Sequence, residues 1–169
     1  MASQIIKKAK VKRRRSMLET AHMGHAILMA AAKNNQILNK LPKSINPVDV
    51  LTFISSNKID HHYIGAIKEV TNFPDETLSD LFDVSVKTYR GYKTTRTLLG
   101  THLQEQTIML LTLMKHGIEV FGTSEKFTEW LEKENFFFDK KKPISFLKSI
   151  NGIKLVDDSL TGMEYGDNA

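Results

Sequence analysis

One short segment of the chain combines side chains that suit contacts with nucleic acid. It contains four basic residues and no acidic one, at Lys87, Arg90, Lys93 and Arg96. Lysine and arginine bind DNA phosphates and base edges, and a neighbouring threonine hydroxyl can add a phosphate contact. The segment therefore predicts DNA binding through Lys87, Thr88, Arg90 and Lys93. The alternative is an ordinary packing helix whose basic face is only solvated.

The elements that must position these side chains have the pattern of a helix-turn-helix over residues 75–93. The apolar face of its first short helix would consist of Leu78, Leu81 and Phe82. Ser79 is small enough for a second helix to cross closely. Asp83 replaces the usual turn glycine, and aspartate tolerates the left-handed conformation better than most residues. Ser85 can then cap the second helix, on which Tyr89 is expected to point inward.

Histidine pairs are the other candidates for chemistry, as metal ligands, but their spacing does not favour a site. His22 and His25 are three residues apart on a predicted helix, yet no third ligand accompanies them at a suitable spacing. His61 and His62 are adjacent and would point to different sides of a helix. The chain also lacks cysteine, a Gly-rich phosphate loop and a nucleophile motif. We therefore expect no metal, no cofactor and no enzymatic activity.

Charge is distributed unevenly along the chain. The net charge is +5, but residues 1–15 carry seven basic side chains and no acidic one, so the remainder is slightly acidic. This arm is either a disordered, solubilising tail or a phosphate-contacting arm, and the sequence leaves both open. The acidic pairs Asp157–Asp158 and Glu132/Glu134 are expected on the wet faces of helices. No apolar run approaches the ~20 residues of a membrane span, and no signal peptide is visible, so we expect a soluble cytoplasmic protein.

Helical patterns fill most of the chain. A helix is predicted from Ser16 to Leu41, followed by a hinge within residues 43–58. Inside that hinge, Val48 to Ile54 suits a helix or a strand, and we favour the helix because Asn46-Pro47 has the form of a helix start. Another helix begins near Asp60 and ends before Phe73-Pro74. Its apolar face would consist of Tyr63, Ile64, Ile67 and Val70.

A long central helix is predicted from His102 to Val120. It carries two apolar stripes: Ile108, Leu111, Met114, Ile118 and Phe121 on one, and Leu110, Leu113, Gly117 and Val120 on the other. A helix that is apolar over so much of its circumference is either central to the fold or shared with a second subunit. We therefore expect a homodimer through this helix, with Leu110 and Leu113 in the interface.

The last third of the chain predicts a compact module of short helices. Gly122 can end the central helix in a left-handed cap, and Ser124 can cap a helix that buries Phe127 and Leu131 with Trp130 alongside. That helix is expected to stop near Asn135. A further helix would start at Pro143 and end at Gly152, and a last one would cover Ile153 to Met163.

These residues resemble the C-terminal toxin-binding domain of the MbcA/ParS/Xre class of bacterial antitoxins, partners of RES-domain toxins. The resemblance covers roughly residues 75–167, and the matching positions are Phe121-Gly122, Trp130-Leu131, Asn135, Pro143-Ile144, Gly152 to Val156, Leu160 and Tyr165-Gly166. Asp139 and Lys140 stand where paired glycines are common, and Gly162 stands where a basic residue is common.

The resemblance implies an antitoxin that binds and inhibits a RES-domain, NAD-degrading toxin and represses its own operon by binding operator double-stranded DNA. It places toxin binding in the C-terminal module, and we expect the closing residues Glu164, Tyr165, Gly166 and Asp167 to contact the toxin. Residues 119–169 hold ten acidic and seven basic side chains, a charge that would complement a basic nucleotide pocket. The alternative function is a stand-alone helix-turn-helix transcription regulator with a C-terminal dimerisation or sensing module.

The predicted fold is therefore all-α, with an Xre-like helix-turn-helix unit followed by a small helical toxin-binding domain. The predicted division is 1–58 for the basic arm and N-terminal helix, 59–101 for the helix-turn-helix unit, and 102–169 for the central helix and the toxin-binding domain.

Overall fold

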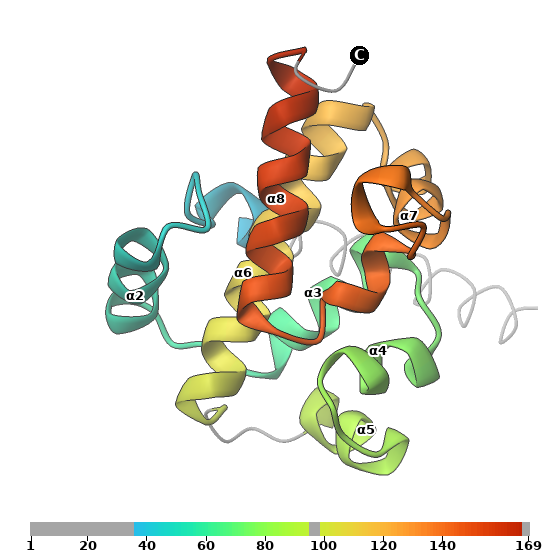
Figure 1. Cartoon of the computed structure of the whole chain (residues 1–169). Helices are drawn as coiled ribbons and strands as arrows, with labels where there is room; N and C mark the ends of the chain where they lie inside the picture. The colour runs from blue at the N-terminus through green and yellow to red at the C-terminus, as the bar shows by residue number, and fades with distance from the viewer. Residues whose placement is uncertain (1–35, 95–98, 167–169) are drawn as a thin grey trace, which may run out of the picture. The chain divides into compact units, whose positions relative to one another are not determined.

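The computed structural model describes residues 36–94 and 99–166, and Ile37–Ala169 form one compact unit. The described residues fold into α-helices and two short 3-10 helices (Figure 1), with a single isolated β-bridge between Asn135 and Lys141. The predicted all-α class is thus confirmed. Among the described residues, no helix is both long and apolar enough to cross a membrane. The three-part division of the chain stays a prediction.

Several sequence predictions fall outside the described residues. These are the basic arm at residues 1–15, most of the helix predicted from Ser16, His22, His25, Arg96 and Asp167. The description begins in a helical stretch at residues 36–40, and the buried side chains of Ile37 and Leu41 join the core.

The segment that was open between helix and strand is helix α2, Pro47–Ser56. Asn46 caps it, because its side chain accepts a hydrogen bond from the backbone N–H of Val48 at 2.8 Å, and Pro47 occupies the first turn. Val50 is buried and α2 packs against the central helix. The hinge predicted within residues 43–58 is therefore wrong, since this segment belongs to the packed body.

The next three helices follow the predicted pattern closely. Helix α3, His61–Thr71, is capped by Asp60 and buries Ile64 and Ile67. Helices α4, Asp75–Leu81, and α5, Val86–Thr94, pack against each other and are joined by a short turn, and the helix-turn-helix role predicted for them stays a prediction. Asp83 in the turn has the left-handed φ of +52° that was expected, and the Ser85 hydroxyl accepts from the Thr88 N–H at 3.1 Å.

The centre of the fold is α6, Thr101–Phe121, which packs against α2, α3, α7 and α8. Both of its apolar stripes are covered within one chain, and Leu110 and Leu113 are fully buried. The prediction that Leu110 and Leu113 form a homodimer interface is therefore wrong, because these side chains already have partners in their own chain. Whether the protein forms a homodimer through another surface stays a prediction. The buried side chain of Gln106 donates hydrogen bonds to the carbonyl oxygens of Leu81, at 2.7 Å, and Lys148, at 3.3 Å.

The C-terminal module consists of α7, Ser124–Glu132, the 3-10 helices η1, Phe136–Phe138, and η2, Pro143–Phe146, and α8, Ile150–Glu164. Gly122 ends α6 in the left-handed conformation as predicted, with φ of +83°. The cap of α7 is Thr123 rather than Ser124, and α7 ends at Glu132, so Asn135 caps η1 instead.

Gly152 has a different role from the predicted helix end. It lies in the first turn of α8, where a Cβ atom would be 1.8 Å from the backbone oxygen of Phe146. Glycine is therefore needed at this position for the close approach of α8 and η2, while Ser149 provides the cap.

Candidate functional site

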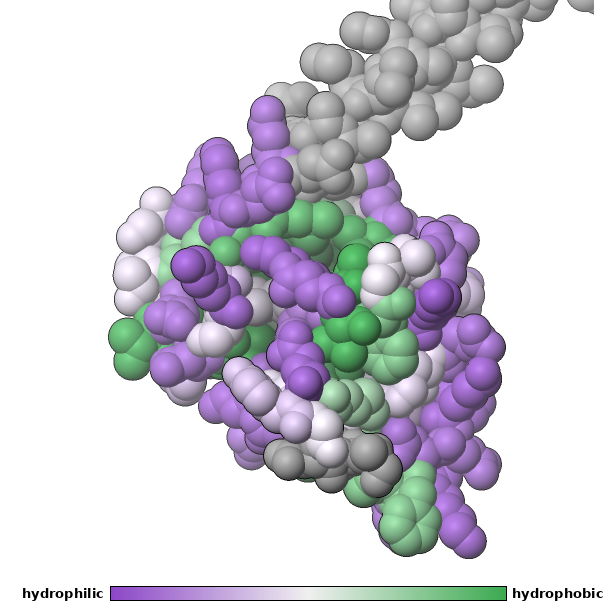
Figure 2. Space-filling view, turned by 90° about the horizontal axis from the view of Figure 1, so that it is seen from above, coloured by the Kyte–Doolittle hydropathy of each residue, from purple (hydrophilic) through white to green (hydrophobic). Residues whose placement is uncertain are grey.

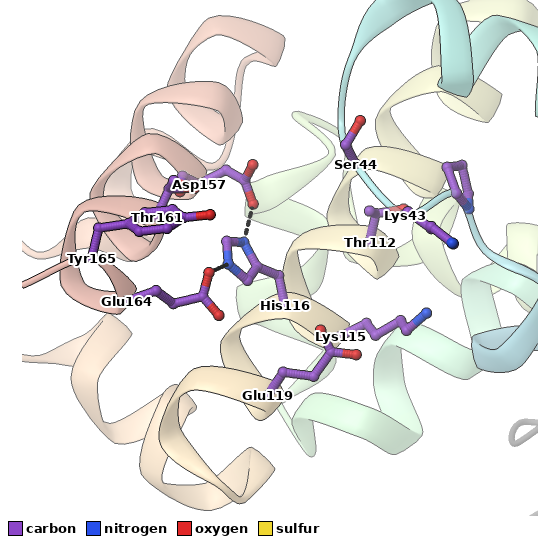
Figure 3. A pocket seen from close by; sticks show the side chains of 11 residues that line it. Lys43, Ser44, Thr112, Lys115, His116, Glu119, Asp157, Thr161, Glu164 and Tyr165 are labelled. Atoms are coloured by element: carbon purple, nitrogen blue, oxygen red, sulfur yellow. Dashed lines mark hydrogen bonds and ion pairs between the residues drawn. The ribbon is translucent and has the colours of Figure 1, made fainter.

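A hollow of about 520 Å³ lies between the second half of α6 and the C-terminal end of α8 (Figure 3). His116 of α6 is at its centre. Its Nδ1 is 2.6 Å from Oδ1 of Asp157, and its Nε2 is 3.3 Å from Oε2 of Glu164. One imidazole ring thus bridges two carboxylates that lie two helical turns apart on α8.

The two carboxylates favour the protonated form of this histidine. The hydrogen bond with Asp157 raises the pKa of His116 above its usual value, Glu164 contributes in the same direction, and partial burial opposes them. Asp157 was expected on a wet face, but its side chain is only 15% exposed and faces His116. Asp158, Glu132 and Glu134 are exposed as expected.

Two of the predicted toxin-contacting residues, Glu164 and Tyr165, lie at the rim of this hollow. Glu164 and Tyr165 line it, and Glu164 is tied to His116 (Figure 3). The side chain of Tyr165 is 79% exposed, and Gly166 has a φ of +78° just after the helix. Figure 2, seen from the side of the C-terminal end of α8, shows a mostly hydrophilic face with apolar surface between the charged groups. The exposure of the Tyr165 ring leaves it accessible to a partner.

An aromatic stack supports this end of the fold. The rings of Phe121, Phe127 and Trp130 lie 5.5 to 5.9 Å apart, centroid to centroid. The ring of Phe127 occupies the space that a Cβ atom on Gly117 would need, so α7 sits directly against the backbone of α6. These residues are the scaffold of the module, and their packing fixes the position of the rim of the hollow.

The predicted DNA-binding residues lie on α5, which Figure 1 shows at the other end of the unit from the C-terminal end of α8. Lys87 and Thr88 are exposed, and the Thr88 hydroxyl is 2.8 Å from that of Ser85. Arg90 and Lys93 are both held by one carboxylate. Arg90 Nε donates to Oδ2 of Asp75 at 2.9 Å, and Lys93 Nζ donates to Oδ1 at 2.8 Å.

Asp75 is thus the counter-charge of the basic face. Hydrogen bonds from Lys93 and Arg90 lower its pKa to about 2, so it stays ionised throughout the neutral range. Its position in the first turn of α4 also suits a negative charge. Sequence reasoning missed this pairing, because Asp75 is 15 and 18 residues away from its partners.

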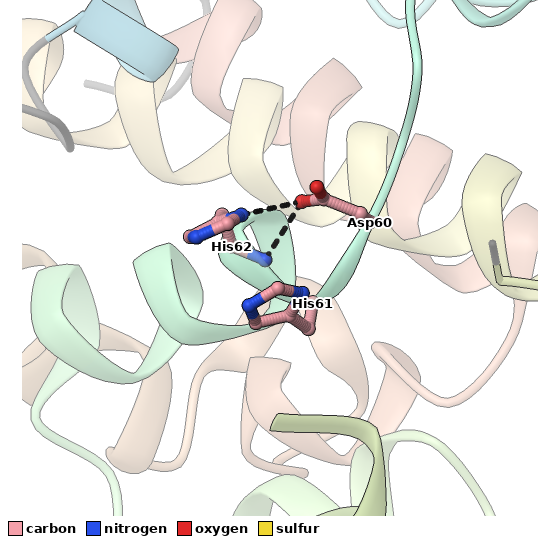
Figure 4. Close-up of side chains that lie close together, drawn as sticks. All are labelled: Asp60, His61 and His62. Carbon is pink, nitrogen blue, oxygen red and sulfur yellow. Dashed lines mark hydrogen bonds and ion pairs between the residues drawn. The ribbon is translucent and has the colours of Figure 1, made fainter. Parts of the chain in front are cut away.

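Asp60, His61 and His62 form a cluster of potential metal ligands at the start of α3 (Figure 4). Asp60 Oδ1 already accepts from the backbone N–H of His62 at 3.0 Å and lies 2.8 Å from its Nδ1. The positive end of a helix dipole disfavours a cation at this position. Asp60 and His62 are therefore accounted for as a helix cap, and we assign no metal to the cluster. The prediction that His61 and His62 point to different sides of the helix is wrong, because their ring centroids are 3.8 Å apart.

No curated protein matches the chain significantly. A family model does match, over residues 116–166, and it is described as the antitoxin Xre/MbcA/ParS C-terminal toxin-binding domain. The matched segment begins at the bridging histidine of the hollow and ends at Gly166, so it contains both the rim and the aromatic scaffold. Over residues 116–166, this chain thus matches the C-terminal toxin-binding domain of the Xre/MbcA/ParS antitoxins.

Proposed function

We propose that the protein is the antitoxin of a type II toxin-antitoxin system and that its partner is a RES-domain, NAD-degrading toxin in the bacterial cytoplasm. The observation that carries this proposal is the toxin-binding domain over residues 116–166. An antitoxin acts by binding, so we expect no catalytic activity from the chain itself.

The closing residues Glu164, Tyr165, Gly166 and Asp167 are the proposed inhibitory contact. A segment at the end of a helix can enter an active-site cleft, and its acidic side chains would complement a pocket built for nucleotide phosphates. The exposed ring of Tyr165 supplies an apolar anchor of the kind that dominates protein interfaces. The bond between Glu164 and His116 holds the end of α8 in place, so less order has to be gained on binding.

Repression of the operon is the second half of the proposal. Lys87, Thr88, Arg90 and Lys93 lie on the second helix of a helix-turn-helix, the element that enters the major groove in DNA-binding proteins of this type. Lys87 makes no ion pair with any described residue, while Arg90 and Lys93 must exchange Asp75 for phosphate or base contacts. A homodimer would present two such helices to a pseudo-palindromic operator, and it would form through a surface other than the buried stripes of α6.

The test is co-expression with the product of the adjacent gene, expected to be a RES-domain protein, followed by co-purification and an assay of NAD consumption. The full chain should form a complex and suppress NAD loss. A chain truncated after Met163 should remain folded, bind DNA and fail to suppress NAD loss. Full suppression by the truncated chain would remove the closing segment from the inhibitory contact. A full chain that binds DNA but neither binds nor inhibits the RES-domain protein would favour the stand-alone regulator.

A further inference from the structure

Two phenylalanine rings project from the loop between α7 and η2. Phe136 is 82% exposed, the largest exposed fraction among the large apolar side chains of the described residues, and Phe137 is 60% exposed. Their rings are nearly perpendicular, with centroids 6.1 Å apart. We call residues 135–142 the aromatic knob. Exposed aromatic pairs are unfavourable in water, so such a pair at a fixed position points to a binding surface.

The backbone of the aromatic knob is closed on itself. The N–H of Asn135 donates to the carbonyl oxygen of Lys141 at 3.1 Å, and the N–H of Lys140 donates to that of Asn135 at 3.0 Å. The Asn135 side chain accepts from the N–H of Phe137 at 2.9 Å. The third ring, Phe138, points inward and packs against Trp130 and Phe146. The knob is therefore anchored on the aromatic scaffold, and its two outer rings are presented by a preformed loop.

Two residues of the loop have backbone angles that their residue types disfavour. Asp139 and Lys140 have φ values of +54° and +60°, two successive left-handed residues that are not glycine. Residues with a Cβ atom adopt this conformation at an energetic cost, and such strain persists only where surrounding contacts impose it. The closing hydrogen bonds and the buried ring of Phe138 are those contacts.

The charge beside the two rings is basic. Lys140, Lys141 and Lys142 are all exposed and follow in the loop after Phe138 and one exposed acidic residue, Asp139, so the loop keeps an excess of positive charge. The lining of the His116 hollow is mixed in charge, with Glu119, Asp157 and Glu164 beside Lys43, Lys115 and His116. The aromatic knob is therefore the more basic of the two surfaces, and both carry exposed aromatic side chains.

We propose that the aromatic knob is a second contact with the toxin, in which Phe136 and Phe137 fill an apolar pocket with an acidic rim on the toxin surface. This inference rests on the proposed function, because the knob lies within residues 116–166, which match the toxin-binding domain. Preformed aromatic anchors at the centre of an interface supply much of its affinity. The closing segment then inhibits, and the knob holds the complex together.

The experiment compares the full-length chain with its Phe136→Ala, Phe137→Ala double variant in binding to the purified RES-domain protein. The matched control is Val48→Ala, Leu51→Ala on α2, which removes two side chains that are 70% and 51% exposed outside the toxin-binding domain. The knob variant should bind about tenfold more weakly or worse, and the control variant should bind normally. Both should keep the wild-type thermal midpoint, since each removes exposed side chains.

A second pair of variants tests the charge. Lys141→Glu, Lys142→Glu should slow association and reduce its salt dependence, whereas Lys40→Glu, Lys58→Glu, which reverses two exposed lysines elsewhere, should not. If the wild type binds the toxin and the double phenylalanine variant has the same Kd, the proposed role of the knob is overturned and the proposed function is not. A complete lack of wild-type binding overturns the proposed function as well. A wild-type dimer that the phenylalanine variant loses, at unchanged toxin affinity, assigns the knob to self-association and also overturns the inference.

Discussion

The basic face of α5 and the outer surfaces of the C-terminal module differ in whether their functional side chains already have partners within the chain. On α5, Arg90 and Lys93 are both ion-paired with one carboxylate of the same chain, Asp75. On the module, Tyr165, Phe136 and Phe137 remain largely exposed on a rigid scaffold. A partner of α5 must therefore compete with an internal carboxylate, while a partner of the module meets surfaces that are already prepared. We expect the toxin-binding surface to be preformed, and we expect DNA affinity to depend on how strongly Asp75 holds the two cations.

The largest expected effect concerns the rigidity of the module. Gly152→Ala would place a Cβ atom 1.8 Å from the backbone oxygen of Phe146, and a backbone atom cannot move aside as a flexible side chain can. We expect a loss of about 3 kcal/mol or more in the free energy of unfolding, near the upper end for overpacking. Urea unfolding followed by circular dichroism measures it.

The matched change on α5 is Gly91→Ala. No neighbouring atom lies within 4 Å of the added Cβ, and alanine favours a helix over glycine by about 0.5 to 1 kcal/mol. The variant should therefore be as stable as the wild type or slightly more stable. Equal destabilisation by both substitutions would contradict the contrast between a closely packed module and a looser α5.

A smaller effect is expected from the His116 bridge. Because Asp157 raises the pKa of His116 in the folded state, the stabilisation is complete below the unfolded pKa, near 6.5, and is lost as the pH rises through the higher folded value. Asp157→Asn should lower the stability by about 1 to 2 kcal/mol at an acidic pH below the unfolded pKa and by much less at an alkaline pH above the raised folded pKa, as for a partly exposed charge-assisted hydrogen bond. Urea midpoints at the two pH values measure the difference. The same loss at both would show that Asp157 acts by packing rather than by charge.

The smallest effect is expected on DNA affinity. Asp75→Asn should release Arg90 and Lys93 for phosphate contacts, so the log–log salt dependence of binding to duplex DNA should steepen by about 1 to 2. Asp83→Asn is the control, because it removes the same charge nearby without touching either cation, and asparagine tolerates the left-handed turn. Fluorescence anisotropy over a range of salt concentrations measures both. Identical slopes for the two variants would show that Asp75 does not restrain the basic face.

Local signals in the sequence were sufficient for most of the helices. Asn46-Pro47 indicated the start of α2, and the spacing of Leu78, Leu81 and Tyr89 indicated the helix-turn-helix, because caps and apolar periodicity depend on neighbouring residues. The sequence also indicated the apolar stripes of α6, but it did not indicate which elements cover them. Periodicity shows that a face is buried and does not distinguish its own chain from a second copy.

The sites depended on contacts that the sequence does not display. His116 and Asp157 are 41 residues apart, and neither belongs to a recognisable motif. The exposure of Phe136 and Phe137 was equally hidden, because three successive phenylalanines indicate burial by composition, and only the loop geometry decides that Phe138 alone points inward. The glycine-like conformation of Asp139 and Lys140 was not predicted from their residue types, which favour other backbone angles.

The match to the toxin-binding domain begins at residue 116, but α6 begins at Thr101. The matched segment therefore starts in the middle of a helix. The earlier turns of α6 bring buried leucines and Gln106, whose side chain bonds the backbone of Lys148 and of Leu81 together. In a chimaera joined at residue 116, the first half of α6 would come from a different protein, and its contacts with this module would be lost. Exchange between relatives, in nature or by engineering, should succeed only with a junction upstream of α6, near Gly100, where the whole helix travels with the domain that it supports.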